Sequence, residues 1–157
     1  MNSLSPILSI VTINKNNSQG LDKTLKSILR QTYSDFDHII IDGASIDGSL
    51  DIIGKYAELT RYKLYWSSEP DSGIYEAMNK GIRMSNGMYI LFLNSGDYFV
   101  NDSILENFFN YQFIEEIVIG NCSVTQNGRV VFNAVPPDEI SLFFFTMVLS
   151  RISQHLF

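Results

Sequence analysis

Cysteine, long apolar runs and clustered positive charge are all scarce in this sequence of 157 residues. Cys122 is the single cysteine, which excludes an internal disulfide and fits a reducing compartment. The most apolar run, residues 140 to 149, is about half of the ~20 residues that a membrane-spanning helix needs, so we interpret it as a buried or interfacial helix. The opening residues MNSLSPILSIVTIN show neither a basic start nor a small-residue cleavage pattern. We therefore expect a cytoplasmic protein, at most in peripheral contact with the inner face of a membrane.

A basic patch and two phosphate-binding patterns are also missing. Seventeen Asp and Glu outnumber eleven Lys and Arg, and the net charge of −6 argues against nucleic acid as a partner, since a phosphate backbone needs gathered cations. The sequence has no Gly-x-Gly-x-x-Gly fingerprint and no Walker lysine loop, which weakens dinucleotide and P-loop interpretations. Zinc lacks ligands as well, because Cys122, His38 and His155 share no metal-binding spacing.

What the sequence does contain is a regular alternation of strand and helix patterns. Its length and its 45% hydrophobic content predict one domain, which we place at 1–157. Short β-branched runs alternate with helical apolar faces, which predicts an α/β fold with a mostly parallel sheet and helices on both faces. The predicted strands are 7–13, 38–41, 63–66 and 89–93, and the predicted helical faces lie in 21–29, 50–57 and 74–82.

The third helix and the segments after it carry weaker patterns. Within 74–82 we expect Tyr75, Met78 and Ile82 to pack in the core, because they recur with helical spacing. For the rest of the chain we expect a short helix capped by Asp102, strands in 117–119 and 122–133 with a hairpin turn at Asn127-Gly128, and a last helical segment from Pro136.

Polar residues cluster where the four predicted strands end. In open parallel sheets, ligands bind outside the carboxyl ends of the strands, where loops and helix N-termini converge. An Asp in such a loop is most often a helix cap or a turn former, and we favour this interpretation for Asp47 and Asp102. Asp42 differs, because it ends an Ile-rich strand, precedes a glycine and has no obvious helix to cap. The four clusters are 12–14, Asp42, 69–71 and 94–97.

An acidic sheet edge of this kind has a requirement of its own. Carboxylates repel a diphosphate, so a phosphate ligand would need a divalent cation to hold it there. Hard oxygen ligands favour Mg²⁺ or Mn²⁺.

Four segments at these strand ends resemble those of a known family. They read SIVTINKN at 9–16, IIIDGASIDGS at 39–49, SEPDSGIYEAMNKGI at 68–82 and FLNSGD at 92–97. In this order and at this spacing they are similar to the GT-A fold, family 2 type of glycosyltransferase, in particular its bacterial polysaccharide branch. The resemblance is close from residue 7 to about residue 97 and fades afterwards.

The resemblance implies a GT-A, Rossmann-like sheet and an inverting glycosyltransferase of the hexosyltransferase type. The donor would be a nucleoside diphosphate sugar, a UDP- or GDP-sugar, and the acceptor a saccharide or a lipid-linked molecule in cell-surface polysaccharide biosynthesis. Residues 1–100 would form the nucleotide-sugar-binding half and 101–157 part of the acceptor-side half. On this interpretation the chain is truncated at its carboxyl end.

The resemblance also implies roles for single residues. Thr12 and Asn14 would lie near the nucleotide, and Asp42 would accept a hydrogen bond from the base edge. A carboxylate only accepts hydrogen bonds, so it suits an imino N–H donor. Asp71 would line the same nucleotide pocket, where Gly73 permits a close approach.

The turn at 94–97 falls where the family usually carries an Asp-x-Asp motif for metal and ribose. Here Asn94 and Gly96 replace the acids, which leaves Asp97 as the one carboxylate for Mg²⁺ or Mn²⁺. Asn94 would stay close to the nucleotide sugar, and the donor diphosphate would supply further oxygens to the metal. The alternative is a plain type I turn without a ligand.

The catalytic base remains unassigned, because the acids after Asp97 resemble helix surface or a helix start. Two other functions stay open at this point. The chain could be a catalytically incomplete nucleotide-sugar-binding module. A nucleotidyltransferase is the third hypothesis, although it would need a glycine-rich phosphate loop near the first strand, where 12–15 contains no glycine.

Overall fold

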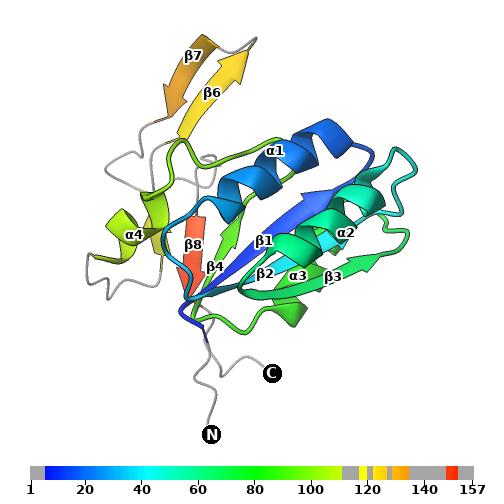
Figure 1. Ribbon diagram of the computed structural model, residues 1–157, viewed down its shortest axis with the longest axis horizontal. Helices are drawn as coiled ribbons and strands as arrows, with labels where there is room; N and C mark the ends of the chain where they lie inside the picture. Colours follow the sequence, from blue (N-terminus) through cyan, green and yellow to red (C-terminus); the bar gives the residue numbers. More distant parts are fainter. Residues whose placement is uncertain (1–5, 111–116, 120–121, 127–128, 135–147, 152–157) are drawn as a thin grey trace, which may run out of the picture.

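A six-stranded sheet forms the centre of the molecule (Figure 1). The structure is a computed structural model that describes residues 6–110, 117–119, 122–126, 129–134 and 148–151. The strands of this sheet are β1 (Leu8–Asn14), β2 (Phe36–Asp42), β3 (Lys63–Ser68), β4 (Tyr89–Phe92), β5 (Ile117–Ile119) and β8 (Val148–Arg151). They lie in the order β3-β2-β1-β4-β8-β5. The first four strands of this order are parallel, and β8 and β5 add antiparallel pairs beyond β4.

β1 is buried over its whole length, as its β-branched run predicts. It lies between β2 and β4 in the middle of the parallel strands. The register places Asn14 opposite Asp42, and Asp42 opposite Ser68, so the last residues of three strands are level. The predicted mostly parallel sheet is confirmed.

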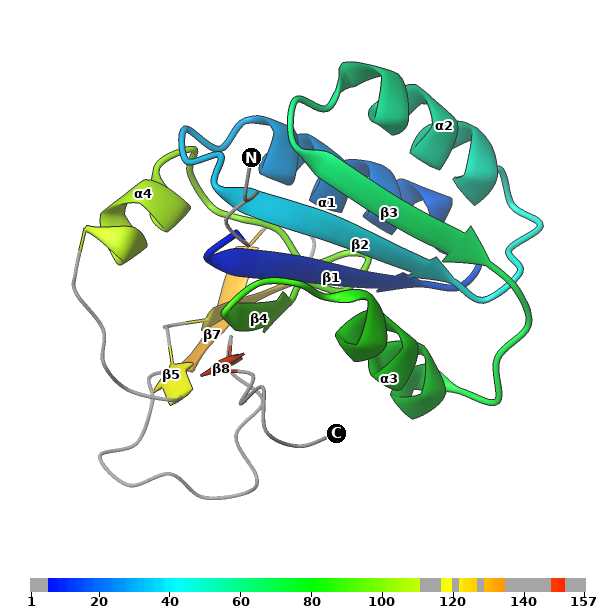
Figure 2. The ribbon, with the colours of Figure 1, turned by 90° about the horizontal axis from the view of Figure 1, so that it is seen from below.

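Helices cover both faces of the parallel strands, as predicted (Figure 2). α1 (Ser18–Leu29) and α2 (Ser49–Leu59) lie on one face, and α3 (Ile74–Met84) lies on the other. α1 begins after Asn17, whose side chain accepts the Gly20 N–H as an N-cap. The core between α1, α2 and β2 consists of Leu21, Leu25, Ile40, Ile53 and Tyr56.

α3 comes close to the sheet because Gly81 has no side chain. A Cβ at this position would lie 2.4 Å from Cγ1 of Val11. Met78 and Ile82 are partly buried against this face, as predicted. Tyr75 is 73% exposed, so the prediction that it belongs to the core is wrong. It lies in the first turn of the helix, beside the strand-end loops, where spacing alone does not ensure a packing partner.

The helix after Asp97 does not have the N-terminal cap that we predicted. α4 (Ile104–Phe109) begins after Ser103, not after Asp102. The Asp102 carboxylate instead lies 3.1 Å from Nε of Arg30, at the end of α1, so its prediction as a helix cap is wrong. β6 (Cys122–Gln126) and β7 (Arg129–Ala134) form an antiparallel pair, which confirms the predicted strand pairing, although the turn residues themselves lie outside the described ranges.

The apolar run at 140–149 contains part of a strand. Val148 and Leu149 belong to β8, so the helical interpretation is wrong for these two residues. β8 pairs with β4, which would otherwise end the sheet with unpaired backbone groups. Residues 140–147 and the helix predicted from Pro136 lie outside the described ranges. Within those ranges, none of the helices has the length and apolar character needed to cross a bilayer.

A chain of buried polar side chains runs between the sheet and the α1–α2 layer. Thr12 Oγ1 donates to the Leu93 carbonyl oxygen at 2.9 Å, so it accepts from Nε2 of His38 at 3.0 Å. The unprotonated Nδ1 of His38 then accepts from the Tyr56 hydroxyl at 2.7 Å, and that hydroxyl also bonds to Tyr62. His38 is fully buried, and burial lowers its pKa to about 3, which keeps the imidazole neutral.

Stability should therefore fall as the pH drops below about 6.5, the ordinary histidine pKa. The unfolded chain binds a proton at His38 there, whereas the folded chain does not until about pH 3. We expect His38 to contribute a loss of about 1.4 kcal/mol between pH 7.5 and pH 5.5, measured by urea unfolding. His38→Gln should be less stable at pH 7.5, but its free energy of unfolding should not show this loss between pH 7.5 and pH 5.5. An unchanged pH dependence in the variant would contradict a buried, neutral His38.

Candidate functional site

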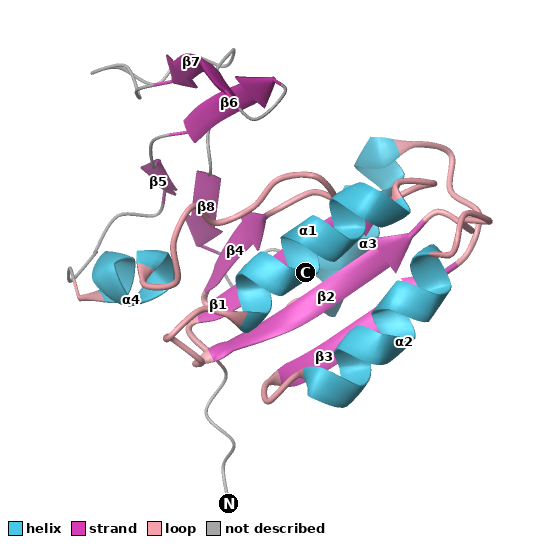
Figure 3. Cartoon of the chain, turned by 45° about the horizontal axis from the view of Figure 1, so that its top comes forward, coloured by secondary structure: helices cyan, strands magenta, loops and turns pink. Residues whose placement is uncertain are grey.

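The predicted site residues lie at one edge of the sheet, because β1 to β4 are parallel and end together. Asn14 and Asp42 are the last residues of β1 and β2. Asp71 and Gly73 belong to the loop between β3 and α3, and the turn at 94–97 follows β4. Figure 3 shows the loops after β2 and β3 gathered at this end of the sheet. The loops that follow the four parallel strands therefore lie at one edge, as the strand pattern of the sequence predicts.

The Asp42 carboxylate is the most heavily hydrogen-bonded group at this edge. Asp42 is fully buried. Its Oδ1 accepts from Asn14 Nδ2 at 2.7 Å and from the Ser45 hydroxyl at 2.6 Å. Its Oδ2 accepts from the Ser45 N–H at 2.9 Å and from the Ser68 hydroxyl at 2.7 Å. One carboxylate thus joins the ends of β1 and β3 to the loop after β2.

These hydrogen bonds also control the ionisation of Asp42. Burial by itself would raise the pKa of this carboxyl, but the donors on Ser45, Ser68 and Asn14 stabilise the ionised form and hold the pKa below its ordinary value. The group therefore carries a negative charge at neutral pH. Its four acceptor positions are occupied by protein donors in this structure.

Thr12 points into the molecule rather than toward the edge. It is fully buried, and its hydroxyl bonds to Leu93 and His38 as described above. Asn14 Nδ2 lies 2.9 Å from the Ser49 hydroxyl, in addition to its bond to Asp42. In this geometry Thr12 and Asn14 support the edge through hydrogen bonds to neighbouring strands and loops.

Asp71 lies against the loop that follows Asp42. A Cβ on Gly43 would be 2.7 Å from Oδ2 of Asp71, so only glycine leaves room for this carboxylate. The Asp71 side chain is 5% exposed, and Lys15 Nζ lies 3.7 Å from its Oδ1. Asp71 Oδ1 also accepts the Gly73 N–H at 3.1 Å. Gly73 has a φ of 137°, a backbone conformation that would be strained in a residue with a side chain. The loops after β1, β2 and β3 meet at this point.

The turn at 94–97 is held to β1 and α1 by hydrogen bonds. The Leu93 and Ser95 N–H groups donate to the carbonyl oxygens of Val11 and Ile13, at 2.9 Å and 3.0 Å, so pairing with β1 continues past β4. Gly96 has a φ of 107°, which favours glycine at this position. The Asp97 N–H closes the turn by donating to the Asn94 carbonyl oxygen at 2.9 Å.

The Asp97 carboxylate remains available for a ligand. Asp97 is exposed at the edge, yet desolvation by its surroundings raises its pKa above the ordinary value, opposed in part by the Asn94 backbone N–H. Within the described ranges no side chain donates to this carboxylate. The Asn94 Oδ1 atom nearby is buried and accepts no hydrogen bond from the described chain.

These oxygens fit Mg²⁺ or Mn²⁺ in chemical type, because both ions prefer hard oxygen ligands. The described residues contain no group of three His, Cys, Asp or Glu side chains placed to hold a metal ion together. Asp97 could therefore act only as one ligand among several, with the remaining positions taken by water or by ligand phosphates.

Several residues at the edge were missed by sequence reasoning. Lys15 lies beside Asp71, and Ser45 and Ser68 donate to Asp42. On α1, Thr24 donates to the Asp97 carbonyl oxygen at 2.7 Å, and Asn17 Nδ2 donates to the Ser95 carbonyl oxygen at 3.0 Å. Asn17 and Thr24 are seven residues apart, a helical spacing of polar groups that the sequence offered as a signal.

The described acids after Asp97 are both engaged elsewhere. Asp102 pairs with Arg30, and Glu106 accepts from the Thr32 hydroxyl at 2.6 Å. Asp47, predicted to be a turn former or cap, accepts from Ser49 at the start of α2 and from the Ser18 N–H, as that interpretation predicts. Glu115, Glu116, Asp138 and Glu139 lie outside the described ranges.

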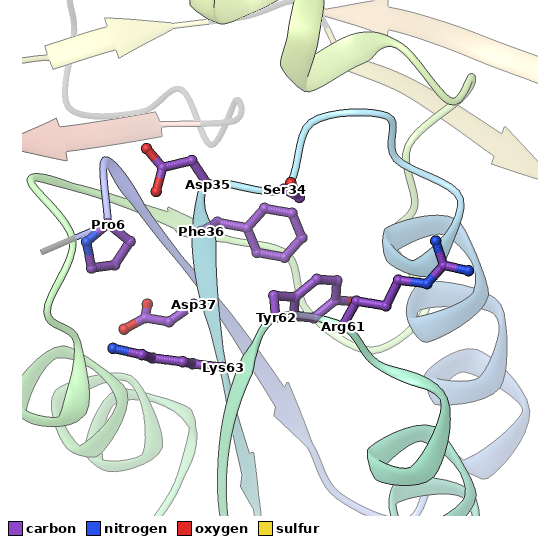
Figure 4. Close-up of a pocket in the computed structure, with 8 residues that line it drawn as sticks. All are labelled: Pro6, Ser34, Asp35, Phe36, Asp37, Arg61, Tyr62 and Lys63. Carbon is purple, nitrogen blue, oxygen red and sulfur yellow. The ribbon is translucent and has the colours of Figure 1, made fainter. Parts of the chain in front are cut away.

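A separate pocket opens at the opposite edge of the sheet, where the strands begin (Figure 4). Phe36 and Tyr62 form an aromatic wall, with ring centroids 4.2 Å apart. Asp37 and Lys63 lie at the starts of β2 and β3, paired in register, and Asp35 and Arg61 add one further charge of each sign. This balance of charge gives the pocket no preference for a phosphate ligand.

Replacing Asp42 by Asn should destabilise the fold by about 2–3 kcal/mol, because an amide NH₂ would face donors that now bind a carboxylate. The measurement is the free energy of unfolding in urea. Asp22→Asn is the matched control, since Asp22 forms an exposed pair with Lys26 at 2.6 Å and should change stability by about 0–1 kcal/mol. Equal losses in the two variants would show that the Asp42 network does not hold the edge together.

Comparison with known proteins shows the family to which the chain is related. The pattern of the family described as glycosyl transferase family 2 matches residues 9–147. An uncharacterised glycosyltransferase of Mycobacterium tuberculosis is 38% identical over 102 residues, which cover 64% of this chain and 38% of that protein. The poly(ribitol-phosphate) β-N-acetylglucosaminyltransferase TarP of Staphylococcus aureus is 32% identical over 134 residues, covering 82% and 40%. The chain thus spans two fifths or less of these curated relatives.

Solved structures show the same fold. A mannosyltransferase from Pyrobaculum calidifontis, in complex with GDP-Man and Mn²⁺, matches with a TM-score of 0.65 at 19% identity over 80% of this chain and 37% of that one. TarS of S. aureus, in complex with UDP-GlcNAc, matches with a TM-score of 0.58 at 23% identity over 66% and 30%. The predicted GT-A type of α/β sheet is confirmed, and with the match over residues 9–147 the chain belongs to glycosyl transferase family 2.

Proposed function

We propose that the carboxyl edge of this sheet binds a nucleoside diphosphate sugar and that the protein transfers the sugar to an acceptor hydroxyl. The observation that carries this proposal is the meeting of four strand-end loops at one edge, with Asp42 and Asp71 on one side and Asp97 on the other. Family membership supports the same reaction class. Residues 1–100 would form the donor half and 101–157 part of the acceptor half.

The base of the donor would lie near the loops after β1, β2 and β3. The ionised Asp42 suits an imino N–H, which would take the place of one present donor such as the partly exposed Ser68 hydroxyl. Asp71 and Gly73 would line the same pocket, and the buried Thr12 and Asn14 on β1 would support it. TarS binds UDP-GlcNAc and the archaeal mannosyltransferase binds GDP-Man, which supports a UDP- or GDP-sugar here.

The diphosphate would lie toward the turn at 94–97. Asp97 would hold Mg²⁺ or Mn²⁺ together with diphosphate oxygens, and Asn94 would contact the nucleotide sugar. Such a metal supplies charge that stabilises the leaving diphosphate. The acceptor oxygen would form a bond to the anomeric carbon as the bond to the diphosphate breaks, with inversion, and a base would take the acceptor proton.

The names of two groups of relatives support the acceptor class that we propose. TarP acts on poly(ribitol-phosphate) by its name, and further relatives of M. bovis and M. tuberculosis are named for PGL/p-HBAD biosynthesis. We propose a saccharide or lipid-linked acceptor in cell-surface polysaccharide biosynthesis, handled in the cytoplasm at the inner membrane face. The second candidate is a nucleotide-sugar-binding module without transfer activity, favoured by the engagement of both described acids after Asp97 in other contacts.

Calorimetry with UDP, GDP and their sugars, with and without Mn²⁺, tests the proposal. We expect one nucleotide to bind the folded chain and Mn²⁺ to strengthen that binding by about ten-fold or more. Asp97→Asn should remove the metal enhancement and leave metal-free binding unchanged. Failure of every nucleotide to bind would contradict the proposal, and binding without sugar transfer or donor hydrolysis would favour the module without activity.

Gly43→Ala tests the base pocket separately. Its new Cβ would lie 2.7 Å from Asp71 Oδ2 and 3.1 Å from Lys15 Cδ, so both side chains must move. We expect nucleotide affinity to fall by about ten-fold, a loss of about 1.4 kcal/mol of binding free energy, measured by calorimetry.

Gly54→Ala in α2 is the matched control for that change, because a Cβ there meets no atom within 4 Å. It should bind nucleotide normally and gain about 0.5–1 kcal/mol of stability from its helix position. If Gly43→Ala binds nucleotide as the control does, the pocket between Asp71 and Gly43 is not where the base lies.

A further inference from the structure

A row of polar side chains on α1 and at its two ends holds the backbone of the chain that follows β4. Thr24 and Ser27 lie within α1, Asn17 is its N-cap, and Gln31 follows its C-cap Arg30. Figure 3 shows the chain between β4 and α4 passing beside α1. The contacts are Asn17 Nδ2 to the Ser95 carbonyl oxygen at 3.0 Å, Thr24 Oγ1 to the Asp97 carbonyl oxygen at 2.7 Å, the Phe99 N–H to Ser27 Oγ at 3.2 Å, and Gln31 Nε2 to the Asn101 carbonyl oxygen at 2.7 Å.

Thr24 makes the central contact of this row. Its hydroxyl donates to the Asp97 carbonyl oxygen and accepts the Gly96 N–H at 2.9 Å. A threonine inside a helix often bonds to the carbonyl four residues earlier. Here that oxygen, on Gly20, is farther away at 3.1 Å. The hydroxyl therefore makes its shorter hydrogen bond to the turn and not to its own helix.

The burial of Thr24 makes a role in packing alone a poor explanation. Thr24 is fully buried on the side of α1 that faces the protein, next to the apolar Leu21 and Leu25. A buried hydroxyl costs free energy unless it is hydrogen-bonded, and valine has nearly the same shape without that cost. The hydroxyl is useful because it meets an N–H and a carbonyl oxygen of the same turn.

The consequence falls on the Asp97 side chain. Gly96 lies at a positive φ, and glycine itself favours positive and negative φ about equally. Contacts from outside the turn therefore help to select one backbone conformation. Thr24 binds on either side of the Gly96–Asp97 peptide, through the Gly96 N–H and the Asp97 carbonyl oxygen. Fixing these two groups sets the direction of the Asp97 carboxylate, which has no side-chain donor of its own in the described ranges.

We propose that Thr24, assisted by Asn17, is a positioning residue for the cation–diphosphate end of the donor site, acting through the backbone of the turn at 94–97. This inference rests on the proposed function, in which Asp97 shares a divalent cation with the donor diphosphate. It assigns to α1, a helix outside the strand-end loops, control over metal-dependent binding. Thr24 itself does not touch the donor.

The test compares Thr24→Val, which keeps the shape and removes the hydroxyl, with Thr24→Ser, which keeps the hydroxyl. UDP or GDP affinity is measured by calorimetry with and without Mn²⁺, using whichever nucleotide binds the wild-type chain. The readout is the ratio of the two affinities. Thr24→Val should reduce the Mn²⁺ enhancement by about ten-fold without changing metal-free affinity, and Thr24→Ser should retain it.

Amide hydrogen exchange provides a readout that needs no ligand. The Gly96 N–H should exchange faster in Thr24→Val and at the wild-type rate in Thr24→Ser, because only the valine variant removes its acceptor. If Thr24→Val does not fold, Asn17→Ser takes its place, since serine still caps α1 but lacks the amide donor to Ser95.

The outcomes distinguish a failure of the positioning role of Thr24 from a failure of the metal role of Asp97. A folded Thr24→Val or Asn17→Ser with the wild-type Mn²⁺ enhancement would overturn the positioning role while leaving the proposed function intact. A wild-type chain that binds nucleotide without any Mn²⁺ enhancement would overturn the metal role of Asp97, and the inference with it. Equal losses of metal-free and Mn²⁺-dependent affinity would show that Thr24 only supports the fold.

Discussion

The hydrogen bonding of the buried Asp42 carboxylate is the interaction on which the carboxyl edge of the sheet depends. It lies at the end of β2 and accepts hydrogen bonds from Asn14 on β1, from Ser68 on β3 and twice from Ser45 in its own loop. An ionised carboxylate without these donors would be costly to bury. Because these donors lie on β1, on β3 and in the loop after β2, one charge aligns three strand ends and shapes the loop between β2 and α2.

A second set of contacts places the turn after β4 relative to those three strand ends. β1 is common to both sets, since Asn14 bonds to Asp42 while Val11 and Ile13 pair with the chain around the turn. α1 completes the arrangement from the other side through Asn17 and Thr24. One central strand and one helix therefore hold the edge, and the loops that bear the acidic side chains are attached to them.

The electrostatics of this edge differ between its two ends. Hydrogen bonds hold the pKa of Asp42 below its ordinary value, whereas desolvation raises the pKa of Asp97. Asp42 thus has its charge stabilised by the protein, while Asp97 has a charge that the protein leaves poorly compensated. A cation would favour the ionised form of Asp97 and offset the repulsion between a diphosphate and an acidic edge. This difference is the physical reason for our proposal that a metal binds at the turn and not beside Asp42.

The sequence by itself determined the parallel strands, the helices between them and the edge at which their polar ends meet, because periodicity and β-branched runs report local burial. Only the tertiary structure decided which polar side chains lie at the edge and which bond inside the molecule or elsewhere on its surface. Thr12 turned inward to His38 and Leu93, Asp102 went to Arg30 in place of a helix cap, and Tyr75 was left exposed. The contacts from Thr24 to the turn and the pairing of β8 with β4 join residues about 60 to 70 positions apart. Spacing along a chain can show that polar residues share one side of a helix, but it does not identify their partners, since these contacts form only when packing brings separate elements together.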